Sequence, residues 1–362
     1  MKTFTHIVIV FCTVSHVFMF IPSISQAVYT KGMITGKNCN EPALWDEIIH
    51  DMQGHPLQLW GWGEVKSAHN WSAHRVLFVD ENDVVEGAAQ VLVRALPGPF
   101  RRLCYVPRGP VWQQGSETAV LDALVAYVRQ HLPGVVLTVE PDHEFVEQPQ
   151  GWRQSANTIL LPRTLILDLS KGLDELQSAM AKKTRQYIRK SSNEQLEFRR
   201  VRTGDEMAAC LAIYHQTAER AGFALHSDQY YHDVHNKLGD SSVIFGAFDA
   251  GQLVSFVWLA VSSHTAFELY GGMNDQGQQL RANYGLKWHA ITACKEWGIE
   301  RYDMNGLLND GVSTFKQGFA SHENTLIGTL DYPLSPLYTV WSRALPAVKR
   351  TVRRAKSLVA KN

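Results

Sequence analysis

The order in which helix and strand patterns follow one another is the feature that most constrains the fold of this chain. Stretches that alternate apolar and polar residues, as half-buried strands do, occur at residues 75–79, 88–94, 135–139, 164–169, 243–247, 253–261 and 266–270. Segments with apolar residues at three-to-four spacing predict helices at residues 42–51, 118–132, 173–191, 205–221, 228–238 and 282–297. Each half offers a helix, two or three antiparallel strands, another helix and a further strand. The repetition predicts an α/β (α+β) protein of two similar units in tandem, with a boundary at residues 157–163.

The join between the two units carries no low-complexity linker. A direct join favours two closely packed domains with a central cleft, and clefts between domains are a preferred place for ligand sites. The second unit also lacks a long charged heptad segment, so the sequence predicts no helical-hairpin arm.

Positive charge is clustered along the chain, although the formal net charge is zero. One basic run spans residues 182–190. A second follows Asp331, after which no acidic residue occurs, and comprises Arg343, Lys349, Arg350, Arg353, Arg354, Lys356 and Lys361. Each run is either a solvated helix face or a surface that meets phosphate, on RNA or on anionic lipid. A hydrophobic fraction of 45% and a charged fraction of 19% exclude a disordered chain.

The five cysteines are scattered, with no C-x-x-C pair and no histidine partner at ligand spacing. This pattern argues against a zinc site and against a disulfide framework, and reduced thiols are the simplest account. We therefore expect no metal.

The first 32 residues admit three readings. Lys2 precedes an apolar run over residues 7–21, and Ser25-Gln26-Ala27 resembles a signal-peptidase site. The run is short and broken for a membrane span. A secretory signal, a membrane anchor and an upstream extension with the true start at Met33 all stay open. We favour the last, because the downstream residues predict cytosolic chemistry.

Four segments, taken together and in order, resemble the Fem family of peptidoglycan bridge-forming aminoacyltransferases. They read LQLWGWGEVK at residues 57–66, YVPRGPV at 105–111, KKTRQYIRK at 182–190, and YDMNG at 302–306 followed by TFKQGF at 314–319. Any one segment alone would be a weak signal. Because the four segments follow one another in order from residue 57 to residue 319, the resemblance extends over nearly the whole chain beyond Met33.

The resemblance implies two acetyltransferase (GNAT)-like domains around a long cleft. The first would span residues 33–160 and be completed by about residues 325–362, and the second would span residues 161–324. The implied reaction moves an amino acid from aminoacyl-tRNA to the stem peptide of a peptidoglycan precursor, either lipid II or UDP-MurNAc-pentapeptide. Because the charged tRNA is a substrate, no cofactor is expected. The implied protein is a cytoplasmic monomer whose basic helices would steer the tRNA or touch the inner membrane surface.

The first unit supplies three candidate substrate-binding residues. Lys66 is expected at a helix end beside Trp60 and Trp62, where an ammonium suits a diphosphate and the indoles offer packing surface. Tyr105 and Arg108 fall in a predicted Pro- and Gly-bounded turn after a strand, and the resemblance implies that Tyr105 hydrogen-bonds the muropeptide. A structural role is the alternative for these residues. Trp60 and Trp62 would then be core residues, and Arg108 would donate hydrogen bonds to loop carbonyls.

The second unit supplies the catalytic candidate. The resemblance places Lys316 where the donor's terminal adenosine and ester lie, so its ammonium would bind phosphate or stabilise an oxyanion, and Phe315 would stack on a base. A core Phe with a surface Lys is the alternative. The resemblance also carries over Tyr230, whereas His226 departs from the family's Arg and could instead cap a helix. Tyr270 is expected to end a strand and to face the cleft.

The mechanism expected from these residues is direct attack of a stem-peptide amine on the donor ester, with Lys316 stabilising charge. No Ser–His–Asp or His–carboxylate pattern indicates a covalent intermediate. The alternative is an acyl-CoA-dependent N-acyltransferase of the GNAT superfamily, which binds pyrophosphate on a Gly-rich turn. Residues 279–286 read QLRANYGL, and a single glycine there disfavours acetyl-CoA. Arg281 and Asn283 would then cap the next helix. A catalytically silent relative that binds membrane or RNA is a third reading.

Overall fold

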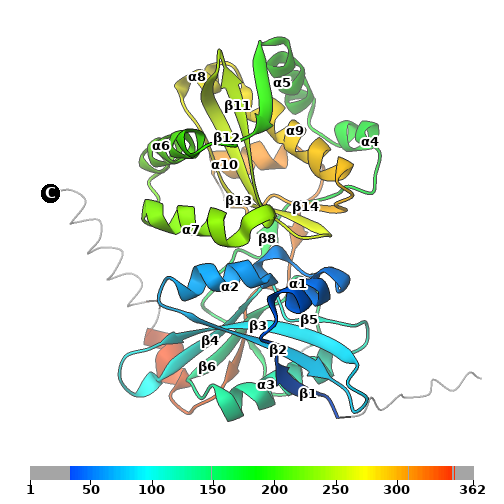
Figure 1. The fold of residues 1–362 in the computed structure, drawn as a ribbon, viewed down its shortest axis with the longest axis vertical. Helices are drawn as coiled ribbons and strands as arrows, with labels where there is room; N and C mark the ends of the chain where they lie inside the picture. The colour runs from blue at the N-terminus through cyan, green and yellow to red at the C-terminus, as the bar shows by residue number, and fades with distance from the viewer. Residues whose placement is uncertain (1–32, 148, 309, 345, 347–362) are drawn as a thin grey trace, which may run out of the picture. The chain divides into compact units, whose positions relative to one another are not determined.

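The computed structural model describes residues 33–147, 149–308, 310–344 and 346. An eight-stranded sheet and a six-stranded sheet, each packed against helices, confirm the predicted mixed α/β fold (Figure 1). A short two-stranded sheet pairs β8 (Arg163–Thr164) with β15 (Asn324–Thr325). The three readings of residues 1–32, and the basic residues beyond Pro346, lie outside the described residues.

The first sheet combines strands from the two ends of the described chain. Its order is β1-β2-β3-β4-β6-β16-β7, with β5 paired to β3. Strand β4 runs parallel to β6, and β16 pairs antiparallel with β6, so the C-terminal segment extends this sheet. The strand bounds are β1 (Thr35–Asn38), β2 (Ser72–Val79), β3 (Val85–Ala95), β4 (Arg102–Pro107), β5 (Val111–Trp112), β6 (Val136–Glu140), β7 (Arg153–Gln154) and β16 (Leu330–Pro333).

Helices cover the first sheet because their apolar residues repeat at helical spacing. Helix α3 (Glu117–His131) buries Val120, Leu124 and Val128 in the cluster that also contains the interior residues of β3, β4 and β6. Helix α1 (Pro42–Asp51) begins with proline at its first position, and the turn η1 (Pro56–Gln58) leads into α2 (Trp60–Ser67). Two further single turns are η2 (Gly98–Phe100) and η3 (Gly239–Ser241).

The second sheet has the order β10-β11-β12-β13-β14-β9. Its strands are β9 (Ile166–Asp168), β10 (Leu196–Arg200), β11 (Ser242–Asp249), β12 (Gln252–Val261), β13 (Thr265–Met273) and β14 (Arg301–Asp303). Strand β14 is parallel to β13 and pairs only with its first residues, from Thr265 to Phe267. The rest of β13 continues without β14 as a neighbour, so the two strands diverge.

Helices pack on both sides of the second sheet. Helix α6 (Gly204–Ala221) contacts β12 and β13; a capping box between Thr203 and Glu206 fixes its start, and Gly222 in the left-handed conformation ends it. The remaining helices are α4 (Leu173–Ser178), α5 (Lys182–Asn193), α7 (Asp228–Leu238), α8 (Asp275–Gln279), α9 (Ala282–Glu296) and α10 (Gly311–Gln317). At 18 residues α6 is the longest described helix, and no helical-hairpin arm occurs within the described part of the chain.

The two units meet where α2 packs against α7. Gly61 makes this contact possible, because a Cβ there would lie 2.2 Å from the carbonyl oxygen of Lys237. His69, just past the end of α2, pairs with Asp233 of α7 at 2.9 Å. Side chains from α2 are thereby held against side chains from the second unit.

Two expected elements differ from the structure. The predicted helix at 173–191 is two helices, because the chain turns at Ala179–Ala181 and the N–H of Ala181 donates to the carbonyl of Gly318. The predicted strand at 164–169 is divided between two sheets. In both cases long-range pairing overrides a continuous local pattern.

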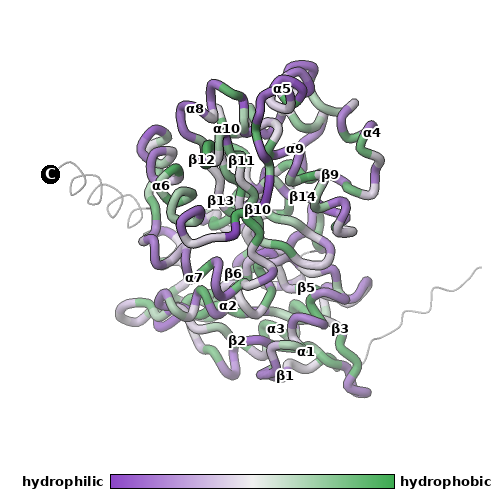
Figure 2. The backbone as a smooth tube through the Cα atoms, turned by 45° about the horizontal axis from the view of Figure 1, so that its top comes forward, coloured by the Kyte–Doolittle hydropathy of each residue, from purple (hydrophilic) through white to green (hydrophobic). Residues whose placement is uncertain are grey.

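Hydropathy follows the layers of the fold (Figure 2). The central strands of the second sheet are largely hydrophobic, whereas α5 at the upper edge of the view is strongly hydrophilic. Among the described helices, none is long and apolar enough to cross a membrane.

Candidate functional site

A cavity of about 630 Å³ lies where β13 diverges from β14. Its apolar wall includes Tyr214, Phe223, Phe256, Leu286, Met304 and Phe315, and its polar groups include Glu268, Lys287, Asn305, Asp310 and Lys316. All of these residues belong to the second unit. We expected a groove between the units, but this cavity is formed within one of them.

Lys316 lies on α10, a short helix that Asp310 begins by accepting hydrogen bonds from the N–H of Ser313 at 2.8 Å and from its hydroxyl at 2.7 Å. The Lys316 ammonium donates to the carbonyl oxygens of Gly306 at 3.1 Å and Asn305 at 3.4 Å. Burial lowers the pKa of Lys316, and the nearby Glu268 carboxylate opposes that shift. A half-buried cation held by carbonyls at a cavity wall differs from a solvated surface lysine.

A second lysine shares the cavity. Lys287 donates to both carboxylate oxygens of Glu268, at 2.5 and 2.7 Å, and the Tyr302 hydroxyl donates to the same carboxylate at 2.8 Å. Burial, together with the Glu268 charge, raises the pKa of Tyr302 well above its usual value. Sequence reasoning missed this pair, although a lysine on the apolar face of α9, next to Leu286, was a signal that could have found it.

Phe315 forms part of the cavity wall beside Lys316. Its ring meets Tyr284 edge-on at 4.9 Å and Phe319 at 5.3 Å. The ring is half-buried, so it packs on its neighbours and keeps one surface for the cavity. The predicted pair Phe315–Lys316 is therefore brought together at one site.

Lys66 lies in the last turn of α2, as expected, and reaches the second unit. Its ammonium donates to the hydroxyl of Tyr230 at 2.8 Å and lies 4.4 Å from the centre of the buried Trp62 ring. Burial lowers the pKa of Lys66 to about 8, and no carboxylate pairs with it among the described residues. A cation without a counter-ion beside an aromatic surface suits an anionic ligand.

Tyr230 connects Lys66 with the cavity. Burial raises the pKa of Tyr230 to about 12, and a side-chain hydrogen bond links it to Tyr270. Tyr270 lines the cavity, and its ring also meets Tyr231 at 5.1 Å. His226 stacks on Tyr230 at 4.0 Å. The predicted residues of α2, α7, β13 and α10 thus form one continuous path.

Tyr105 and Arg108 do not line the cavity, although Tyr105 belongs to the same buried cluster as Trp62 and Tyr230. Tyr105 lies within β4 rather than in a turn, is 6% exposed, and donates its hydroxyl to Glu140. Arg108 is 1% exposed and donates to the carbonyl of Leu161 at 3.3 Å. Both side chains are enclosed by protein, and a role for either in substrate binding stays a prediction.

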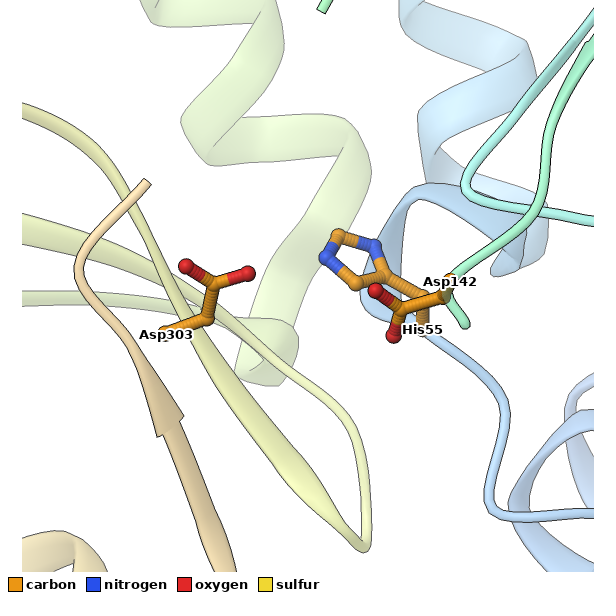
Figure 3. Close-up of side chains that lie close together, drawn as sticks. All are labelled: His55, Asp142 and Asp303. Carbon is orange, nitrogen blue, oxygen red and sulfur yellow. The ribbon is translucent and has the colours of Figure 1, made fainter. Parts of the chain in front are cut away.

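Arg108 borders a buried cluster of His55, Asp142 and Asp303, drawn in Figure 3. His55 comes from the start of η1, Asp142 follows β6 and Asp303 ends β14, and one ligand atom from each lies within 4.8 Å of the others. Arg301 donates to both carboxylate oxygens of Asp142. The spacing of these three ligand atoms is compatible with a metal ion.

The hydrogen bonds of this cluster disfavour a metal. His55 accepts the N–H of Leu57 on Nδ1 at 3.1 Å, so the neutral ring carries its proton on Nε2, which is buried and has no hydrogen-bond partner among the described residues. Arg301 and Arg108 already supply positive charge here, which leaves a divalent cation uncompensated. Burial lowers the pKa of His55 to about 3 and raises that of Asp303. We interpret the cluster as a polar junction between the units.

The segment expected to hold pyrophosphate in an acyl-CoA enzyme serves packing instead. Gly285 lies inside α9, where a Cβ would come within 2.6 Å of both Phe198 and Ser191. Arg281 occupies the N-cap position of α9, as expected, but its side chain makes no capping hydrogen bond, and its guanidinium lies 4.8 Å from the centre of the Tyr187 ring. The glycine is required where α9 meets α5 and β10, so the segment offers no glycine-lined cradle for phosphates.

The fold and the site together define a class of protein. Two α/β units in tandem, each with a sheet packed against helices, define a protein of two GNAT-like domains. The chain belongs to the FemAB family, whose model matches residues 48–157, 148–248 and 251–345. It is an enzyme of the aminoacyltransferase type.

Relatives and solved structures agree with this assignment. The chain is 21% identical over 410 residues to "Lipid II:glycine glycyltransferase" of Staphylococcus epidermidis, covering 86% of this chain and 98% of that protein. The crystal structure of FemX superposes with a TM-score of 0.74 at 19% identity, covering 85% of this chain and 99% of FemX. A tandem GNAT protein from the clavulanic acid biosynthesis pathway superposes with a TM-score of 0.50 at 11% identity, over 84% of this chain and 99% of that one.

Proposed function

We propose that this enzyme moves an amino acid from aminoacyl-tRNA to an amine of the stem peptide of a peptidoglycan precursor, and so builds the interpeptide bridge. The glycyltransferase of Staphylococcus epidermidis is named for lipid II, which supports a precursor of this kind as acceptor. The observation that carries the proposal is the Lys316 ammonium, fixed by two carbonyls beside Phe315 at the cavity wall.

The cavity is the proposed donor site. An adenosine carrying an aminoacyl ester needs an apolar surface for its base and cations for its phosphate, and this cavity offers both. Phe315 supplies an aromatic surface, and Lys316 supplies the charge. Lys287 is neutralised by Glu268, whereas the Lys316 ammonium donates to carbonyl oxygens and remains available to the donor's phosphate.

The neighbourhood of Lys66 is the proposed acceptor site. Both forms of the precursor carry a diphosphate, which an unpaired ammonium attracts. Tyr230 and Tyr270 extend from Lys66 to the cavity, so the stem peptide would follow them towards the donor ester. We propose that this happens on the cytoplasmic side of the membrane, where charged tRNA is available.

The proposed chemistry needs no covalent enzyme intermediate. The stem-peptide amine attacks the ester carbonyl carbon, and the Lys316 ammonium stabilises the resulting oxyanion. The carbon–oxygen ester bond then breaks, the ribose oxygen takes up a proton, and the former amine loses one. The two carboxylates of the cavity wall already have partners, since Glu268 binds Lys287 and Asp310 binds Ser313. Positioning of the activated ester therefore supplies most of the rate.

Transfer from a mixture of charged tRNAs tests the proposal directly. The purified protein is offered these donors with the nucleotide-linked and the lipid-linked precursor, and the products are weighed by mass spectrometry. We expect a mass increase of one amino-acid residue on one precursor. No increase on either precursor, together with saturable binding of acetyl-CoA, would favour an acyl-CoA enzyme and reject the proposal.

A further inference from the structure

A row of aromatic rings connects the wall of the cavity with helix α5. Phe315 lines the cavity, Tyr284 of α9 stands edge-on to it at 4.9 Å, and Tyr187 of α5 stands edge-on to Tyr284 at 4.9 Å. Tyr187 and Tyr284 are half-buried, so each ring keeps an accessible part. Helices α5 and α9 lie side by side (Figure 1), which makes the row continuous.

Two cations lie over the outer ring of this row. The Arg281 guanidinium is 4.8 Å from the centre of the Tyr187 ring, and the Lys183 ammonium is 5.5 Å from it. Arg281, the N-cap residue that precedes α9, has a φ of 57°, a left-handed conformation that is uncommon outside glycine. Aromatic rings with an adjacent guanidinium are the usual platform for unpaired bases.

The exposed face of α5 is wholly basic in its charge. Lys182, Lys183, Arg189 and Lys190 are exposed, the helix contains no acidic residue, and none of the four pairs with a carboxylate in the described part of the chain. Residues seven positions apart lie two turns, or about 10 Å, apart on the same side of a helix. The four cations therefore form a strip opposite the buried residues of α5. Figure 2 shows α5 as a hydrophilic segment.

Arg185 is the one cation of this run with a structural task. Its guanidinium donates to the carbonyls of Gln177, Ser178 and Met180 at 3.4, 3.1 and 2.6 Å, and so completes the end of α4. The other four side chains have no comparable task among the described residues. The strip of Lys182, Lys183, Arg189 and Lys190 is thus available to a partner.

A membrane would require different chemistry on α5. Helices that lie on anionic lipid expose large apolar side chains beside their cations, which enter the bilayer. On α5 the apolar Ile188 is buried, and the ring of Tyr187 contacts Tyr284 on the way to the cavity. The aromatic groups extend towards the donor site instead of outwards, which fits RNA.

We propose that α5, together with Tyr187, Tyr284 and Arg281, binds the acceptor arm of the donor RNA. Unpaired nucleotides at the 3′ end stack on Tyr187 and Tyr284 before the terminal adenosine enters the cavity beside Phe315. The phosphates of the adjoining duplex lie along the strip of Lys182, Lys183, Arg189 and Lys190. This assignment rests on the proposed function, since it assumes that the donor is an aminoacyl-tRNA.

Binding of uncharged RNA separates this surface from catalysis. The probes are an RNA hairpin with a short unpaired 3′ end and the same hairpin with a blunt end, and their affinity is measured by fluorescence anisotropy over a range of salt concentrations. The double variant Lys182→Gln/Arg189→Gln should bind the first hairpin about tenfold more weakly and reduce its salt slope by about 2. The matched control Lys37→Gln/Lys171→Gln removes two exposed lysines that pair with Asp83 and Glu175, and it should bind as the wild type does.

The tyrosine row has its own variant. Tyr187→Ala should weaken binding of the hairpin with the unpaired end by about tenfold, because stacking contributes roughly 1–3 kcal/mol per base, and leave the blunt hairpin unaffected. Tyr187→Phe keeps the ring and should bind normally, which excludes misfolding as the cause.

The outcomes distinguish this inference from the proposed function. An RNA affinity that is unchanged in the α5 double variant would overturn the assignment of α5 as an RNA-binding surface, but not the proposed function. If the α5 double variant lost binding to phosphatidylglycerol-containing vesicles while its RNA affinity stayed unchanged, the strip would be assigned to a membrane. That result would also overturn the proposal that α5 binds RNA. A wild-type protein that binds neither hairpin would reject the tRNA donor itself.

Discussion

The ammonium of Lys66 lies 2.8 Å from the hydroxyl oxygen of Tyr230, although 164 positions separate the two residues in the chain. One comes from α2 of the first unit and the other from α7 of the second. The contact depends on the close packing of these helices at Gly61. It places the proposed acceptor cation at the start of a tyrosine path that ends at the cavity wall.

The charge of Lys66 should set the pH dependence of acceptor binding. Its pKa is lowered to about 8 by burial, so the ammonium is present below pH 8 and lost as the pH rises through that value. We expect the KM for the precursor to rise above pH 8 in the wild type. Lys66→Met should raise that KM roughly tenfold or more at pH 7 and remove the pH dependence, because a charged hydrogen-bonding partner contributes about 1.5–3 kcal/mol.

Lys66→Arg provides the control, since it keeps a cation that does not titrate in this range. Its KM should stay flat through pH 8. An unchanged KM in Lys66→Met would exclude Lys66 from the acceptor site.

Lys316→Met should lower kcat by roughly 10²- to 10³-fold, the cost of removing one donor from an oxyanion site. The affinity for uncharged RNA should change much less, because the loss falls on the transition state. Single-turnover transfer measures the first quantity and anisotropy the second. A Lys316→Met enzyme with normal kcat would reject the catalytic assignment.

His55 should make folding sensitive to acid. Its folded pKa is about 3 because of burial, whereas the unfolded side chain titrates near 6.5, so protonation favours the unfolded state. The contribution of His55 to the free energy of unfolding is fully present above pH 6.5. It falls by roughly 1 kcal/mol per pH unit as the pH drops towards 3. The pKa of the neighbouring Asp142 is lowered and that of Asp303 is raised, so both carboxylates add their own pH dependence.

Urea denaturation at several pH values checks this. His55→Gln should be less stable at pH 7 but less sensitive to acid than the wild type. His131→Gln removes an exposed histidine and should keep the acid sensitivity of the wild type. Equal acid sensitivity in all three proteins would contradict the assignment to His55.

The cluster of His55, Asp142 and Asp303 should not respond to metal. Nδ1 of His55 already accepts a hydrogen bond, and two guanidinium groups offset the two carboxylates. We expect the same thermal midpoint with added Zn²⁺ or Mn²⁺ and with a chelator. A rise of several degrees with one metal, lost in Asp303→Asn, would reveal a metal site.

Gly285→Ala should destabilise the second unit by roughly 1–3 kcal/mol, because the added Cβ would lie 2.6 Å from Phe198 and Ser191. Helix propensity alone favours Ala by about 1 kcal/mol. A decrease in the free energy of unfolding would therefore show that packing dominates at this position, and an increase would show that helix propensity does. Gly204→Ala is the control, since no heavy atom lies within 4 Å of its added Cβ, and it should be neutral or slightly stabilising. Thermal denaturation compares the two.

Local patterns predicted the regular elements well. Helices α1 and α7 have the bounds expected from their apolar spacing and from Pro42 and Ser227 at their starts. Strands β4, β10, β14 and β16 were not expected, because they are short or carry charged and proline residues that weaken a strand pattern. Pairing with neighbouring strands stabilises them in the fold.

The candidate site was predicted in part, by resemblance and not by spacing. Lys66, Tyr230, Tyr270, Phe315 and Lys316 form a connected path, while Tyr105 and Arg108 are buried and do not line the cavity. The position of Lys287 on the apolar face of α9 was a signal of a buried cation, but nothing in the sequence indicates that its partner is Glu268 on β13.

The sequence by itself determined where helices and strands form and which family the segments resemble, because periodicity and turn residues act over a few neighbouring positions. The tertiary structure decided which cations have partners. Lys287 meets a buried carboxylate and Arg185 completes a helix end, whereas Lys66 and Lys316 donate hydrogen bonds only to neutral oxygen atoms among the described residues. That division depends on distances between residues far apart in the chain, and it is what separates structural cations from those proposed to bind substrate.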